Sequence, residues 1–235
     1  MLLLLSGASG VGKSTARQLI QERLGSRVEA VELAHLAAIP ATPTVSWRQQ
    51  TAEKAVRRAL KLRDEGQHLL LAGDPVVPGE ILATPSARHL DIAICLLDAD
   101  EATQTARLLS RGDPDELLPN HLAFAAWLRR HARDPQHMLH VITDGSWEPM
   151  RWDRVRRVPT GDPHWRIPII DSSGLSKDEV ADHASRWADS ALAGQQPVFR
   201  AGWYRLIAPP RMDQREAAGR SAPKRGESPR VSWRV

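Results

Sequence analysis

A loop of small residues with a single lysine lies near the start of the chain. Residues 7–14 read GASGVGKS and satisfy the pattern G-x-x-x-x-G-K-S/T at every fixed position. In this pattern backbone amides and the start of the next helix surround phosphate oxygens, the lysine contacts the outer phosphates, and the last hydroxyl binds Mg²⁺. The sequence therefore predicts a nucleoside triphosphate site formed by Gly7, Ala8, Ser9, Gly10, Val11, Gly12, Lys13, Ser14 and Thr15.

Charged side chains elsewhere in the chain could complete this site. Arg107 and Arg111 are four residues apart, so on a helix they share one face and can reach the same phosphate chain. Asp74 follows an apolar run and can hold Mg²⁺ through water, with Ser14 as the other metal-binding residue. The alternative for Asp74 is a turn before proline, and for each arginine an ordinary solvated surface position. Further candidates for holding an anionic substrate are Arg48, Arg129, Arg130 and Arg133.

The candidate residues can form one site only if the strands bring them close to the loop at residues 7–14. Apolar runs predict strands at residues 2–5, 28–33, 68–72, 92–97 and 167–170. Asp74 follows the third of these runs, and Glu32 lies at the end of the second, with His35 just beyond it. In a parallel sheet, ligands lie beyond the carboxyl ends of the strands. We therefore expect Glu32, His35 and Asp74 near the loop.

Helical spacing of apolar residues fills the segments between these runs. It predicts helices from the loop to Gly25 and at residues 46–66, 101–110, 121–133 and 176–194. Ser46 with Gln49, and Ser176 with Glu179, match the capping box that starts a helix. Strands that alternate with helices predict an α/β fold with a parallel sheet covered on both faces.

Composition and charge limit the classes of protein to which the chain can belong. The chain has 235 residues and a net charge of +4. Residues 209–235 hold seven basic and three acidic groups, so this segment carries the whole excess and predicts a flexible, solvated tail. The single cysteine, Cys95, lies in an apolar run and predicts a buried, reduced thiol. With no signal peptide and no membrane span, the sequence predicts a cytoplasmic monomer or homodimer.

A tryptophan-rich and arginine-rich insert occupies residues 144–165. Trp147, Trp152 and Trp165 alternate there with several arginines and match no core element. This composition suits an acceptor pocket, a partner surface or nucleic-acid stacking equally well.

Three segments together give the chain a family resemblance. The loop at residues 7–14, the sequence RLLSRG at 107–112 and the turn DSSG at 171–174 resemble P-loop kinases of the nucleoside-monophosphate kinase type, including the shikimate and gluconate kinase branch. The resemblance covers about residues 1–192. It implies a P-loop NTPase three-layer sandwich with sheet order 2-3-1-4-5 and a mobile lid at about 112–140. Length and composition predict one domain, at residues 1–208, followed by the tail.

The resemblance also implies roles for residues outside the loop. Ser172 and Gly174 would wrap the adenine of ATP. The acceptor would bind between the second and third strands, where an acid orients or deprotonates its hydroxyl. That acid is usually an aspartate, whereas this chain has Glu32, with His35 beside it on the acceptor side.

The leading hypothesis is an ATP-dependent and Mg²⁺-dependent kinase that transfers the γ-phosphoryl group to a small-molecule hydroxyl or phosphate. One alternative is a nucleic-acid-end kinase, suggested by the basic tail and the insert at residues 144–165. Another is a nucleotide-binding regulatory module with little catalysis. The single asparagine, Asn120, and the absence of an N-K-x-D sequence exclude an ordinary GTPase, and no L-S-G-G-Q segment indicates an ABC-type ATPase.

Overall fold

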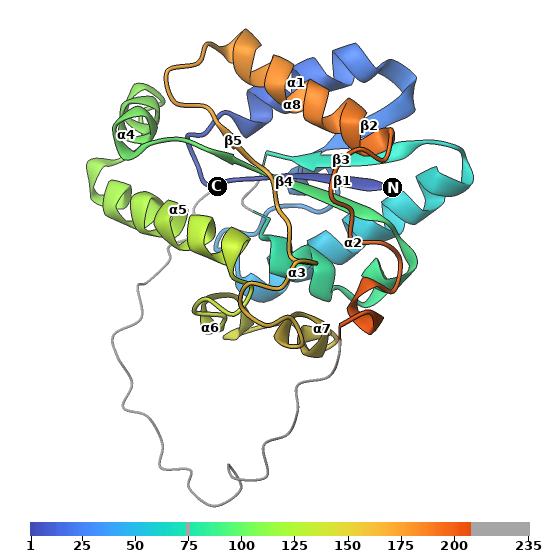
Figure 1. Ribbon diagram of the computed structural model, residues 1–235. Helices are drawn as coiled ribbons and strands as arrows, with labels where there is room; N and C mark the ends of the chain where they lie inside the picture. Colours follow the sequence, from blue (N-terminus) through green and yellow to red (C-terminus); the bar gives the residue numbers. More distant parts are fainter. Residues whose placement is uncertain (74–75, 208–235) are drawn as a thin grey trace, which may run out of the picture.

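Five parallel strands form one sheet with helices on both faces (Figure 1). The computed structural model describes residues 1–73 and 76–207. The strand order is β2-β3-β1-β4-β5, as predicted. The predicted tail at 209–235 and the candidate Asp74 lie outside the described residues. The strands are β1 Leu2–Ser6, β2 Val28–Val31, β3 His68–Ala72, β4 Ile92–Asp98 and β5 Ile169–Asp171.

The centre of the sheet is apolar on both faces. Leu2, Leu3, Leu4 and Leu5 of β1 are all buried and pair with β3 on one side and β4 on the other. A continuous apolar run suits a strand that helices cover on both sides. Cys95 of β4 is buried as predicted, and burial raises the pKa of its thiol, so the thiol stays protonated.

Eight α-helices are assigned to the described residues, and α1 and α8 cover one face of the sheet while α2, α3 and α5 cover the other (Figure 1). Within the described ranges, no helix combines the length and apolar character that crossing a bilayer requires. The α-helices are α1 Lys13–Leu24, α2 Val45–Asp64, α3 Pro78–Ala83, α4 Glu101–Ser110, α5 Leu118–Arg133, α6 His140–Thr143, α7 Trp152–Arg156 and α8 Lys177–Leu192. Short 3-10 turns are η1 Gly25–Arg27, η2 Leu33–His35, η3 Pro85–His89, η4 Asp115–Leu117 and η5 Trp203–Arg205.

One of the two predicted capping boxes is confirmed. At the start of α8, the Ser176 hydroxyl accepts a hydrogen bond from the Glu179 amide, and the Glu179 carboxylate accepts one from the Ser176 amide. The box predicted at Ser46 is wrong, because Thr44 caps α2 instead. Thr44 has the extended backbone that a cap needs, and its hydroxyl accepts a hydrogen bond from the Trp47 amide at 3.1 Å.

Two strands differ from their predicted bounds. The second strand ends at Val31 rather than residue 33, because the chain turns into η2 directly after Glu32. The fifth strand starts at Ile169 rather than residue 167. Pro168 has no N–H for the ladder, although its carbonyl accepts a hydrogen bond from the Leu96 amide at 2.9 Å.

Much of the predicted lid at residues 112–140 belongs to the core. The inner face of α5 is buried, including Phe124, Trp127 and Leu128. Arg129 of the same helix donates a hydrogen bond from Nε to Asp98 Oδ2 at 2.6 Å, which ties α5 to the end of β4. A mobile lid at residues 112–140 therefore stays a prediction, and its movement would have to include a helix, α5, that covers the sheet.

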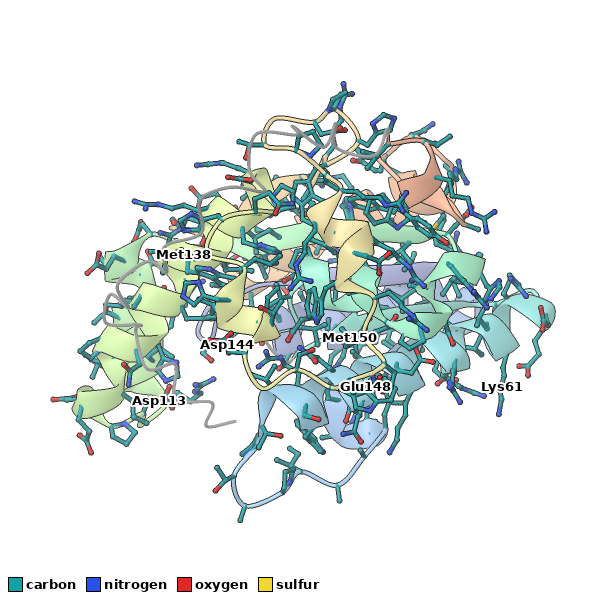
Figure 2. The ribbon with its side chains drawn as sticks, turned by 90° about the horizontal axis from the view of Figure 1, so that it is seen from below. Lys61, Asp113, Met138, Asp144, Glu148 and Met150 are labelled. Atoms are coloured by element: carbon teal, nitrogen blue, oxygen red, sulfur yellow. The ribbon has the colours of Figure 1, made fainter. Side chains whose placement is uncertain are left out.

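The predicted insert at residues 144–165 is also part of the core. Trp152 and Trp165 are buried, and their ring nitrogens donate hydrogen bonds to Ser146 Oγ and to the carbonyls of His131 and Ala132. These two rings are not available to stack on a ligand, so that interpretation is wrong for them. Figure 2 shows this segment from below, where Asp144, Glu148 and Met150 follow one another beside α2.

A buried histidine, His131, lies between the rings of Trp127 and Trp165. The His131 ring stacks on Trp127 at 5.0 Å between centroids and meets Trp165 edge-on at 5.7 Å. Its Nε2 accepts a hydrogen bond from the Gly79 amide at 3.3 Å. Burial away from water disfavours the charged imidazolium.

Lowering the pH should destabilise the fold through His131. Burial lowers the pKa of His131 from 6.5 to about 3. The unfolded chain therefore binds more protons, and the free energy of unfolding should fall by about 1 kcal/mol from about pH 6.5 to about pH 5.5. Urea titrations would measure this loss, which should shrink in His131→Leu and persist in His183→Leu on the exposed face of α8. An equal loss in both variants would contradict the assignment to His131.

Candidate functional site

The glycine-rich loop at residues 7–14 leaves the carboxyl end of β1 and enters α1, as the sequence predicts. Gly10 and Gly12 have φ values of +82° and +100°, which side chains with a Cβ rarely adopt. The backbone turns sharply at these two glycines, so the loop folds around the start of α1. In Figure 1 this end of the sheet faces α4 and the start of α8.

The loop presents a series of unpaired backbone donors. Among the described residues, the amides of positions 8–12 donate no hydrogen bond to the protein. The first turn of α1 adds further N–H groups that have no partner inside a helix. Unpaired amides beside the positive end of a helix dipole favour an anion.

Lys13 lies inside this loop. Its side chain is buried, and Nζ donates a hydrogen bond to the Ala8 carbonyl at 2.6 Å. Because an ammonium group has three donors, this contact is compatible with a further bond from Nζ to an anion in the loop. Lys13 therefore brings positive charge to the same place as the unpaired amides.

A cavity of about 650 Å³ opens over the loop and the start of α1. Arg107, Ser110 and Arg111 of α4 line a second side, and Leu175, Ser176, Lys177 and Val180 line a third. Glu32 and Gly73, which follow β2 and β3, complete the lining. From the predicted set, the structure thus gathers Ser9, Gly10, Gly12, Lys13, Ser14, Thr15, Glu32, Arg107 and Arg111.

Arg107 joins the cavity wall to the turn after β5. Its guanidinium donates hydrogen bonds to Ser172 Oγ at 2.9 Å and to the Ser172 carbonyl at 2.8 Å. Ser172 Oγ in turn donates to the Val11 carbonyl at 3.1 Å. Ser172 is fully buried and Gly174 is exposed, and neither lines the cavity. Ser172 therefore connects the turn to the loop from behind.

Arg111 is the more exposed of the two α4 arginines. Its side chain is 57% exposed and forms a two-point ion pair with Asp113, just past the end of the helix. An anion in the cavity would compete with Asp113 for this guanidinium. Exposed ion pairs contribute about 1 kcal/mol or less, so such an exchange is inexpensive.

Glu32 has a fixed position at the opposite wall. Its Oε1 accepts a hydrogen bond from Arg17 Nε at 3.1 Å, and the side chain lies against Gly73. His35 accepts a hydrogen bond from the Glu32 amide at 3.3 Å and does not line the cavity. Glu32 is therefore the carboxylate among the described residues that line the cavity.

Arg48 is not placed to hold a soluble acceptor. It is 3% exposed and forms a buried two-point ion pair with Glu80 of α3. The candidate role of Arg48 in substrate binding is wrong for this conformation, because the guanidinium is enclosed in the core. Arg129 is held by Asp98, and Arg130 and Arg133 are exposed on α5 away from the cavity lining.

Several cavity residues were absent from the sequence prediction. Lys177, Leu175 and Val180 line the cavity but belong to no motif, and Ser110 lies within the RLLSRG segment, of which only the two arginines were predicted site residues. Only the capping box at Ser176 marks the start of α8, and the sheet topology is needed to place that start beside the loop.

Comparisons with known proteins give distant structural likenesses. No protein-family model and no curated protein matches the chain. An uncharacterized protein from Eubacterium ventriosum is 14% identical and the match covers 81% of this chain and 99% of that one, with a TM-score of 0.46. A sugar kinase from a Janibacter species is 16% identical over 82% and 96% of the two chains, with a TM-score of 0.47.

A third solved structure covers a smaller part of the chain. A chain of the Pnkp1/Rnl/Hen1 RNA repair complex is 18% identical and the match covers 55% of this chain and 45% of that one, with a TM-score of 0.41.

Proposed function

We propose that this protein is a P-loop phosphotransferase that binds ATP with Mg²⁺ and transfers the γ-phosphoryl group to a small-molecule hydroxyl or phosphate. One observation carries the proposal. Unpaired loop amides, the Lys13 ammonium and the guanidinium groups of Arg107 and Arg111 all border a single cavity.

The cavity residues suit the charge of a triphosphate. Loop amides and Lys13 would hold the β- and γ-phosphates, and the Ser14 hydroxyl would hold Mg²⁺, whose chemistry is to neutralise charge on bridging phosphate oxygens. Arg107 and Arg111 would face the same chain from α4. Transfer spreads negative charge over the three equatorial oxygens of the γ-phosphoryl group, so donors fixed in advance lower the barrier.

Glu32 is the residue that we propose for the acceptor side. The acceptor oxygen would attack the γ-phosphorus in line while the bond to the β,γ-bridging oxygen breaks, and the acceptor proton would pass to the Glu32 carboxylate. Arg17 holds that carboxylate in place at 3.1 Å. Asp74 remains a candidate for the metal through water.

Binding and turnover test the proposal separately. Calorimetry with ATP and Mg²⁺ should show uptake at one site, and addition of an acceptor should stimulate ADP release. We would screen nucleosides, nucleotides, sugars and aminoglycoside-like alcohols. No uptake of ATP or GTP with magnesium present would overturn the proposal, whereas ATP uptake without phosphoryl transfer to any acceptor would indicate a regulatory module.

A nucleic-acid-end kinase remains a second hypothesis, although Trp152 and Trp165 are buried and leave it with less support. A 5′-hydroxyl oligonucleotide in the same screen distinguishes the two. Phosphorylation of the oligonucleotide with an affinity that falls steeply with salt would favour the nucleic-acid acceptor.

A further inference from the structure

We propose that Gln104 of α4 is a positioning residue that aims the Gly10 amide of the loop at the triphosphate. This inference rests on the proposed function. Gln104 belongs to no motif and does not line the cavity. It acts on the loop from behind, through a hydrogen bond to the backbone.

The hydrogen bond fixes the orientation of one peptide group. Gln104 is fully buried, and its Nε2 donates to the Ser9 carbonyl at 2.8 Å. In a planar trans peptide, the carbonyl and the next N–H point in opposite directions. Because the Ser9 carbonyl points toward Gln104, the Gly10 N–H points away from it. Rotation of this peptide would remove one donor from the anion site.

The amide oxygen of Gln104 indicates that packing alone does not account for a glutamine at this buried position. Gln104 Oε1 is buried and has no hydrogen-bond partner among the described residues. A buried polar atom without a partner costs about 1–3 kcal/mol. A methionine would fill a similar volume without that cost, so the Nε2 donor is the feature that distinguishes glutamine here.

The loop lies directly on α4 at this point. A Cβ on Gly10 would be 3.0 Å from Leu108 Cγ and 3.3 Å from the Gln104 carbonyl oxygen. Arg107 and Arg111 follow Gln104 by three and seven residues, so the three side chains share one helical face. One helix therefore carries both the residue that holds the loop peptide and the two arginines that line the cavity.

The test compares Gln104→Met with Gln136→Met. Gln136 is a matched control because its Nε2 also donates to backbone carbonyls, those of Val155 and Val158, at 2.9 and 2.8 Å, remote from the loop. Calorimetry would give the affinities of each variant for tripolyphosphate and for adenosine. We expect tripolyphosphate to bind about tenfold more weakly to Gln104→Met, equivalent to about 1.4 kcal/mol, while its adenosine affinity stays unchanged. Gln136→Met should match the wild type with both ligands.

A second variant keeps the test decisive if Gln104→Met folds poorly. Gln104→Glu preserves the shape, and only its protonated acid can donate to the Ser9 carbonyl. Its tripolyphosphate affinity relative to wild type should therefore fall as the pH rises from about 5 to about 8. Equal tripolyphosphate affinity in wild type and Gln104→Met, or an equal loss for adenosine and tripolyphosphate, would overturn the role of Gln104. Failure of the wild type to bind tripolyphosphate at all would overturn the proposed function as well, and is seen before any variant is compared.

Discussion

Replacing Lys13 with methionine should lower the rate of ATP turnover at least about 10²- to 10³-fold, the loss typical when one fixed donor to a developing charge is removed. The side chain is buried at the centre of the glycine-rich loop. Methionine keeps most of its volume but removes the ammonium group. The γ-phosphoryl oxygens would then lose their closest side-chain cation, while the sheet and its helices keep their packing.

The control for this variant is Lys61→Met. Lys61 is exposed on α2 and points outward at the rim of the molecule (Figure 2). Steady-state assays of ADP release would compare the two variants, and far-UV circular dichroism would show that both are folded. Normal turnover by Lys13→Met would contradict the assignment of the loop.

The sheet and the loop were predictable because their signals are local. Continuous apolar runs such as residues 92–97 identify buried parallel strands without knowledge of their neighbours. The loop pattern fixes spacing within eight residues, and the structure places nine of the predicted site residues around one cavity. The strand order followed from the family resemblance rather than from the residues themselves.

The errors concern residues whose environment depends on distant segments. Arg48 and Trp165 resemble surface binding residues in sequence, but both are buried by segments far away along the chain. The partner of Arg48 is 32 residues away, and the acceptors of the Trp165 ring nitrogen are 33 and 34 residues away. The spacing of apolar residues along the sequence indicates helices and strands, but it does not show which distant residue will pair with a given side chain. Similarly, the charged residues of α5 give no sign in the sequence that its inner face is buried against the sheet.

Removing the partner of a buried charge should have the largest effect on stability. Arg48→Met leaves the Glu80 carboxylate in a site with 0% exposure and without its guanidinium partner. Breaking a buried ion pair in this way typically costs about 3–5 kcal/mol. Gln49 Nε2, at 3.3 Å from Glu80 Oε1, and the Val77 amide, at 3.4 Å from Glu80 Oε2, still donate hydrogen bonds but do not replace the lost charge. Urea denaturation should show a midpoint well below that of the wild type.

The double variant Arg48→Met, Glu80→Met separates stability from substrate binding. Replacing both partners removes the unpaired charge, so much of the lost free energy of unfolding should return. If Arg48 serves the fold, the double variant should also recover phosphoryl transfer, because the cavity beside Lys13 does not include Arg48. Recovery of stability together with a rise in the acceptor KM would instead return Arg48 to the acceptor site, which would require α2 and α3 to separate during turnover. Measuring both quantities on the same protein therefore decides between a core ion pair and a binding residue.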